Sequence, residues 1–142
     1  MNVVDSSAWL EYLANGANAG YFAPAIEAVD QLLVPAIVIY EVFRRVLQQR
    51  GEDAALQAVA LLHQGEIVAV DSALALYGAR LGAEHKLPLA DSLVYATARL
   101  RNAIVWTQDA DFAELPEVRY RAKRRSRQGY DGTSGARARR AT

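Results

Sequence analysis

Short apolar stretches alternate along the first 120 residues with longer amphipathic segments. The apolar stretches are rich in valine, isoleucine and leucine and predict strands, mostly buried, at residues 2–4, 32–34, 66–70, 103–107 and 118–120. The amphipathic segments predict helices at residues 7–13, 19–29, 36–50, 52–63, 72–84 and 89–101. Strands separated by helices of this length imply βαβ units with right-handed crossovers. The pattern therefore predicts an α/β fold with a small, mainly parallel central sheet.

Length and composition fit one soluble domain with its own core. The chain has 142 residues, of which 52% are hydrophobic and 23% charged. There is no cysteine, which excludes disulfides and thiolate metal sites, and two histidines do not favour a zinc site. No apolar run approaches the roughly 20 residues that cross a bilayer, and the N-terminus has no secretion-signal pattern. A cytoplasmic location without membrane contact is therefore expected.

A formal net charge of zero conceals a strong asymmetry. Residues 119–142 contain eight arginines and one lysine against one aspartate, which gives +8; residues 1–118 then hold seven basic and fifteen acidic groups, which gives −8. Such asymmetry predicts an acidic domain over residues 1–120 and a basic tail over 121–142 that is disordered without a partner. The tail would either add sequence-independent affinity for nucleic acid or be a solvated appendage without function.

Three acids stand alone inside apolar segments. Asp5 follows Val3 and Val4, while Glu41 and Asp91 are each the single charge in a run of about twelve residues. An isolated buried carboxylate is costly, and the cost is offset when several such groups share a cation. Oxygen ligands without histidine or cysteine favour Mg²⁺ or Mn²⁺.

The predicted strands place further acids at the same edge of the sheet. Asp5 follows the first strand, and Asp109 and Asp111 follow the strand at 103–107. The carboxyl ends of parallel strands are where open α/β sheets bind ligands. Thr107 and Asp109 are two residues apart and face the same side if the strand stays extended. Asp111 joins them only if the extension continues, so the choice between Asp109 and Asp111 stays open.

Each acid also has a simpler interpretation. Asp5 or Ser6 would suit a helix N-cap, and Asp91 would suit one if its helix began later. Glu41 lies too deep in its helix to be a cap, and its alternative is an ion pair with Arg44 or Arg45. Asp109 and Asp111 alone are more often turn residues. These alternatives are independent of one another, whereas a shared metal site explains all the acids together.

With these residues the chain resembles the PIN-domain family, and within it the VapC-type toxin ribonucleases of toxin–antitoxin pairs. The resemblance covers about residues 1–120 and rests on the order and spacing of four pieces. They are Val4-Asp5-Ser6-Ser7, Glu41 in the helix after Val34-Pro35, Leu89-Ala90-Asp91-Ser92-Leu93, and Thr107-Gln108-Asp109-Ala110-Asp111-Phe112.

The resemblance implies helices sandwiching the sheet, an acidic pocket for Mg²⁺ or Mn²⁺, and cleavage of RNA. The acids that it implies are Asp5, Glu41, Asp91 and Asp109, with Asp111 as a further or substitute member. Thr107 and the serines after Asp5, Ser6 among them, are candidate hydroxyls for orienting the carboxylates. By the same resemblance we expect a VapB-type antitoxin and a homodimer.

Two other functional classes compete with a metal-dependent ribonuclease, and a structural protein with buried ion pairs is the residual alternative. A PIN-like module that binds RNA or protein without cleavage would not need the full set of acids. A phosphoacceptor receiver domain would need adjacent acids after an early strand and a lysine after a late one. The only lysines are Lys86 and Lys123, which disfavours the receiver domain.

Overall fold

The structure is a computed structural model and describes residues 1–124. Its sheet has five parallel strands in the order β3-β2-β1-β4-β5. Their bounds are β1 Asn2–Val4, β2 Leu32–Pro35, β3 Glu66–Val68, β4 Ile104–Thr107 and β5 Val118–Tyr120. The predicted parallel sheet is confirmed, with β1 at its centre and β5 at an edge.

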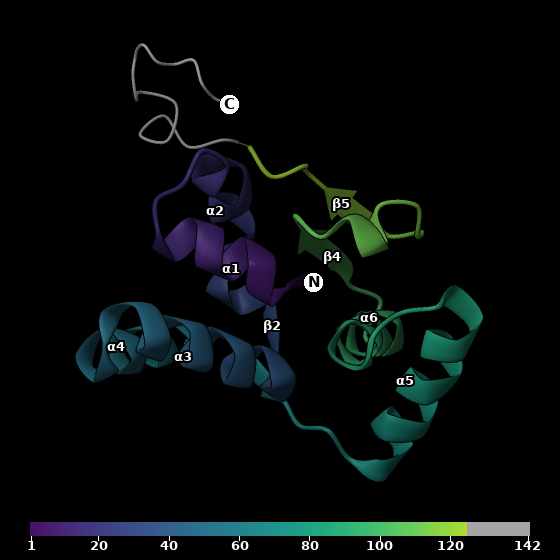
Figure 1. The fold of residues 1–142 in the computed structure, drawn as a ribbon. Coiled ribbons are helices and arrows are strands. Elements are labelled where there is room, and N and C mark those ends of the chain that lie inside the picture. Colours follow the sequence, from purple (N-terminus) through teal and green to yellow (C-terminus); the bar gives the residue numbers. More distant parts are fainter. Residues whose placement is uncertain (125–142) are drawn as a thin grey trace.

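Within the described residues, six α-helices surround this sheet. They are α1 Ser6–Leu13, α2 Ala19–Glu27, α3 Ala36–Arg50, α4 Glu52–Leu62, α5 Ser72–His85 and α6 Leu89–Leu100, with 3₁₀ turns at Val29–Gln31 and Ala110–Phe112. Figure 1 shows them as three neighbouring pairs, α1 with α2, α3 with α4 and α5 with α6. The result is the three-layer α/β arrangement that the sequence predicts.

Helix α6 is the most deeply buried helix of the described chain. Seven consecutive residues, 92–98, are buried, so almost no face of the helix meets solvent over two turns. Such all-round burial is typical of a core helix, and α6 contacts β1, β2 and β4. The first turn of α6, which carries Asp91, is thereby held against the centre of the sheet.

Several element ends differ from the predicted ones for local reasons. Helix α2 ends at Glu27, two residues early, and the chain continues as a 3₁₀ turn. Strand β3 ends at Val68 because the chain leaves the sheet there, and Val70 is exposed. Proline 35 is the N-cap of α3 and the last residue of β2, so strand and helix join without a loop.

The first residues of the predicted tail contact the domain. The Arg121 amide donates to the Thr107 carbonyl (3.0 Å), and the Asn18 side-chain amide donates to the Ala122 carbonyl (3.0 Å). The Arg121 guanidinium lies 4.0 Å from the centre of the Tyr21 ring. Residues 125–142, which hold the rest of the predicted disordered tail, lie outside the described residues. In the described part of the chain no helix is long and apolar enough to span a membrane.

Candidate metal centre

Asp5 is the first residue after β1 and the N-cap of α1. One carboxylate oxygen, Oδ1, accepts from the Ala8 amide (3.2 Å) and the Ser7 hydroxyl (2.7 Å), and Oδ2 accepts from the Thr107 hydroxyl (2.8 Å). The residue is only 3% exposed. The helix-cap interpretation of Asp5 is therefore correct, but the cap bond uses one of several lone pairs and leaves the carboxylate in the centre of the site.

Thr107 connects two of the predicted acids. Besides donating to Asp5, its buried hydroxyl accepts from the Asp109 amide (2.8 Å), which fixes the backbone as the chain leaves β4. Asp109 then caps the 3₁₀ turn by accepting from the Asp111 amide (2.9 Å). The side chain of Asp109 is thus turned toward Asp5, whereas Asp111 is exposed.

Three carboxylates meet at the carboxyl edge of the sheet. One oxygen from each of Asp5, Asp91 and Asp109 lies within 4.8 Å of the other two. Asp91 comes from the first turn of α6, whose N-cap is Pro88, so Asp91 is not itself the cap. Asp5 and Asp91 are 86 residues apart along the chain, and Asp91 and Asp109 are 18 residues apart. The parallel topology of the sheet brings the three acids together.

Two of the clustered acids, Asp5 and Asp91, have raised pKa values. Burial raises the pKa of Asp5 from 3.8 to about 6, although hydrogen bonds from Ser7, Thr107 and Ala8 oppose the shift. Burial and the charges of Asp109 and Asp5 raise the pKa of Asp91 from 3.8 to about 8. Carboxylates that disfavour one another's ionisation at this spacing are suited to a shared cation. Because the cluster offers only carboxylate oxygens, its donor set fits Mg²⁺ or Mn²⁺.

The remaining predicted residues lie around this cluster. Glu41 is half-buried on α3 and lines a cavity of about 270 Å³ with Ser6; it is outside the three-acid group. Within residues 1–124 no ion pair joins Glu41 to Arg44 or Arg45, its alternative partners. Asp111 is outside the group as well, but its charge contributes to the raised pKa of Asp91. Ser7, rather than Ser6, bonds to Asp5.

Two polar residues of the site were not predicted. The Gln108 backbone amide donates to the Ser7 hydroxyl (3.0 Å), and the Gln108 side-chain oxygen accepts from the Asn18 side-chain amide (2.6 Å). Asn18 is buried and also holds Ala122, so a chain of hydrogen bonds runs from the segment after β5 to Asp5. No local pattern marks Asn18, because its partner is 90 residues away.

The fold and the site together define an α/β protein with a cluster of carboxylates, suited to a cation, at the carboxyl edge of a parallel sheet. The sequence matches the PIN domain model over residues 3–118, and the chain belongs to the PIN domain family. A search by sequence among curated proteins finds no match.

Solved structures of toxin–antitoxin proteins have the same fold. A toxin–antitoxin complex from Klebsiella pneumoniae is 26% identical with a TM-score of 0.68, covering 84% of this chain and 96% of that one. VapC20 of Mycobacterium tuberculosis, a toxin that cleaves the sarcin–ricin loop, is 18% identical with a TM-score of 0.70, covering 83% and 97%. VapBC2 of Rickettsia felis, bound to a promoter DNA fragment, is 14% identical with a TM-score of 0.66, covering 85% and 97%.

Proposed function

We propose that this chain is a metal-dependent endoribonuclease and the toxin of a VapBC-type toxin–antitoxin pair. The observation that carries the proposal is the meeting of Asp5, Asp91 and Asp109 within 4.8 Å in a PIN domain. A PIN-like module that only binds its partners would have no need for three mutually repelling carboxylates, since their clustering costs folding free energy.

Asp5, Asp91 and Asp109 would hold Mg²⁺ or Mn²⁺, with Glu41 and Asp111 as proposed further members at the rim. A bound divalent cation lowers the pKa of water and neutralises charge on the phosphoryl oxygens. The chain supplies the orientation. Thr107 and Ser7 donate hydrogen bonds to different oxygens of Asp5. These two bonds would fix the orientation of the carboxylate whether it binds an ion or a water molecule.

The proposed partner is a VapB-type antitoxin. The support comes from structural neighbours in which a toxin of this fold is described together with its antitoxin, including the Klebsiella pneumoniae and Rickettsia felis proteins. RNA as substrate rests on the family resemblance and on the activity named for VapC20. The homodimer remains a prediction from the same resemblance.

Removing the Asp5 carboxylate tests the proposal. The wild-type chain should cleave a single-stranded RNA with Mg²⁺ or Mn²⁺ and stop when EDTA is added. Asp5→Asn keeps an oxygen that can cap α1 but loses the charge, so we expect cleavage to fall by about 100-fold or more, by analogy with other essential catalytic groups. Initial rates from gel-resolved products would measure this, with Asp30→Asn, an exposed acid outside the cluster, as the matched control.

Three results would contradict the proposal of a metal-dependent nuclease, and a fourth would contradict its choice of RNA. Full activity in Asp5→Asn would remove the acid cluster from the chemistry. Undiminished cleavage in EDTA would exclude the metal. RNA binding without any cleavage by the wild-type chain would favour the binding-module alternative. Equal cleavage of a DNA strand of the same sequence would contradict the RNA assignment alone, because the acid cluster itself does not read the 2′-hydroxyl.

A further inference from the structure

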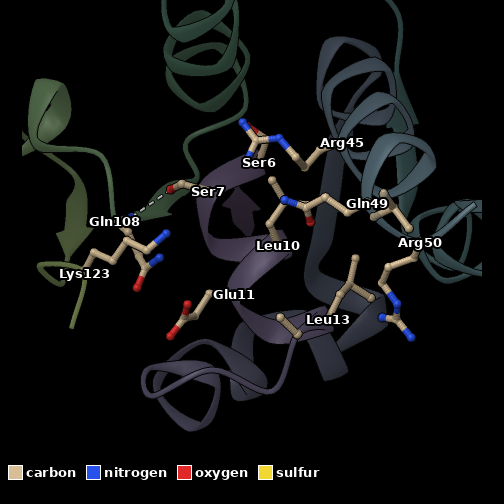
Figure 2. Close-up of a pocket in the computed structure, with 12 residues that line it drawn as sticks. Ser6, Ser7, Leu10, Glu11, Leu13, Arg45, Gln49, Arg50, Gln108 and Lys123 are labelled. Carbon is tan, nitrogen blue, oxygen red and sulfur yellow. Dashed lines mark hydrogen bonds between the residues drawn. The ribbon is translucent and has the colours of Figure 1, made fainter. Parts of the chain in front are cut away.

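A cavity of about 440 Å³ lies directly beside the acid cluster. Figure 2 shows Ser7 and Gln108 on one side of it, and these two residues bond to each other (3.0 Å) next to Asp5 and Asp109. Helix α3 forms the opposite wall with Arg45 and Arg50, and Leu10 of α1 lies between the two walls. A molecule bound in this cavity would therefore extend to the site of the proposed reaction.

The cavity is positively charged although the neighbouring site is acidic. It is lined by three cations, Arg45, Arg50 and Lys123, and none of them forms an ion pair within residues 1–124. Its one acid, Glu11, is buried and accepts from the Asn18 backbone amide (2.7 Å). Three cations without an acidic partner are an arrangement that suits a polyanion.

A second cavity continues the first over the same two helices. The cavity of about 270 Å³ shares Ser6, Leu10 and Arg45 with the larger one, so Arg45 lies where the two meet. The smaller cavity adds a further cation, Arg44, and an aromatic side chain, Tyr40, which is 60% exposed. It also adds one half-buried acid, Glu41, so the cations of the whole groove still outnumber its acids. We name the two cavities together the α1–α3 groove.

We propose that the α1–α3 groove binds a single strand of RNA on one side of the cleaved phosphate. Arg45, Arg50 and Lys123 hold its phosphates, and a base stacks on Tyr40. Positive grooves with exposed aromatic rings are the common arrangement for single strands. Stacking on Tyr40 requires an unpaired base, which favours a single strand over a duplex. This inference rests on the proposed function for the identity of the strand as RNA.

Binding without cleavage tests the groove separately from the chemistry. The full chain in EDTA would be titrated into a fluorescent, unstructured RNA of about 12 nucleotides, a length in the range that single-strand sites cover. Anisotropy at several salt concentrations gives both affinity and salt slope. Arg45→Gln, Arg50→Gln and Lys123→Gln should each weaken binding about threefold to tenfold and lower the slope by about 0.7. Arg80→Gln, the same charge change on an exposed position of α5, should change neither.

The stacking contact has its own pair of variants. Tyr40→Leu should weaken RNA binding at least about fivefold, while Tyr40→Phe, which keeps the ring, should bind like the wild type. In cleavage assays the groove variants should raise KM and leave kcat nearly unchanged, because they remove binding that is equal before and during the reaction.

Three outcomes would count against the proposed groove. Unchanged binding in the arginine and lysine variants overturns it. The single-strand assignment is overturned if a hairpin duplex binds as tightly as the unstructured RNA and the same variants weaken its binding to the same extent. Equally tight binding of polyglutamate would assign the groove to an acidic protein segment instead. If Asp5→Asn abolishes cleavage but the groove variants bind RNA normally, the proposed function stands and the groove inference fails. If the wild-type chain cleaves nothing but the groove variants weaken RNA binding, the proposed function fails and the groove inference stands.

Discussion

The Asp5 carboxylate combines two roles that sequence reasoning treats as alternatives. It caps α1 through the Ala8 amide and at the same time faces Asp91 and Asp109. A carboxylate has about four lone-pair positions, so one cap bond does not exhaust it. The cap in fact supports the site, because it fixes the side chain at the point where the strand becomes a helix.

Thr107 offers a test of how much the site depends on this fixation. Thr107→Val keeps the shape but removes the bonds to Asp5 and to the Asp109 amide. We expect the free energy of unfolding to fall by about 1–3 kcal/mol, since buried partners lose a hydrogen bond. The rate of RNA cleavage should fall at least tenfold, a larger effect than the stability loss alone produces at temperatures where the chain stays folded. Urea denaturation and initial rates measure the two effects.

The matched control for this variant is Thr97→Val. Thr97 is equally buried, but its hydroxyl bonds only to the Leu93 carbonyl one turn earlier in α6. That carbonyl keeps its helical partner, so the loss should stay below about 1 kcal/mol. If Thr97→Val reduces cleavage as much as Thr107→Val, the proposed orienting role of Thr107 is wrong.

Single residues could be predicted where their own neighbourhood marks them. Asp5 and Asp91 are conspicuous as lone charges in apolar segments, and Asp109 follows a strand end. The choice of Asp109 over Asp111 for the cluster depends on a bond between the Thr107 side chain and the Asp109 backbone, which no periodicity encodes. Glu41 is as conspicuous in the sequence as Asp91. Its distance from the cluster depends on how α3 packs against the rest of the domain, and the sequence of α3 alone does not predict that packing.

At the scale of elements, the alternating pattern predicted every α-helix and every strand that the structure has in residues 1–124, with small errors at their ends. The type of each element follows from apolar periodicity, which is strong in segments such as α6. The ends depend on caps and on where the sheet stops. Lys86, for example, ends α5 in a left-handed conformation without a glycine to announce it.

The turn from α4 into β3 gives an element-scale prediction. A methyl group added at Gly65 would lie 2.9 Å from the Leu32 carbonyl oxygen, and this oxygen belongs to the backbone of β2. Because backbone cannot move without displacing the strand, Gly65→Ala should destabilise the fold by about 1–3 kcal/mol. Gly20→Ala, inside α2 with nothing within 4 Å, should be neutral or stabilise by up to about 1 kcal/mol.

Thermal melting of both glycine variants checks this prediction. Cleavage activity of folded Gly65→Ala should match that of the wild type, since β3 lies at the sheet edge far from β4 in strand order. A Gly65→Ala protein as stable as Gly20→Ala would mean that the close approach of this turn to β2 is not present in solution.

For the whole molecule, the acid cluster couples stability to pH. The pKa values of Asp5 and Asp91 are raised in the folded chain, so the folded state binds more protons than the unfolded state above about pH 4. Their contribution to stability is therefore complete at low pH and is lost as pH rises through about 6 and about 8. The melting temperature of the metal-free chain should fall between about pH 5 and about pH 8.

A divalent cation should reverse this loss. Mg²⁺ binds the deprotonated carboxylates, so it should raise the melting temperature more at about pH 8 than at about pH 5. Asp91→Asn should show a smaller fall with pH and a smaller Mg²⁺ effect, while Asp30→Asn should behave like the wild type. Identical profiles of melting temperature against pH for the wild type and Asp91→Asn would show that ionisation of the clustered carboxylates does not destabilise the folded chain.

The position of β1 at the centre of the sheet has a consequence for synthesis on the ribosome. Strand β1, which Asp5 follows, emerges before its neighbour β4, which ends 103 residues after β1. At a translation rate of roughly 5–20 residues per second, the nascent chain spends roughly 5–20 seconds with Asp5 made and Asp109 not yet made. During that interval β1 lacks a partner on one side and the acid cluster cannot form. The acid cluster can therefore assemble only after nearly the whole domain has emerged from the ribosome that makes it.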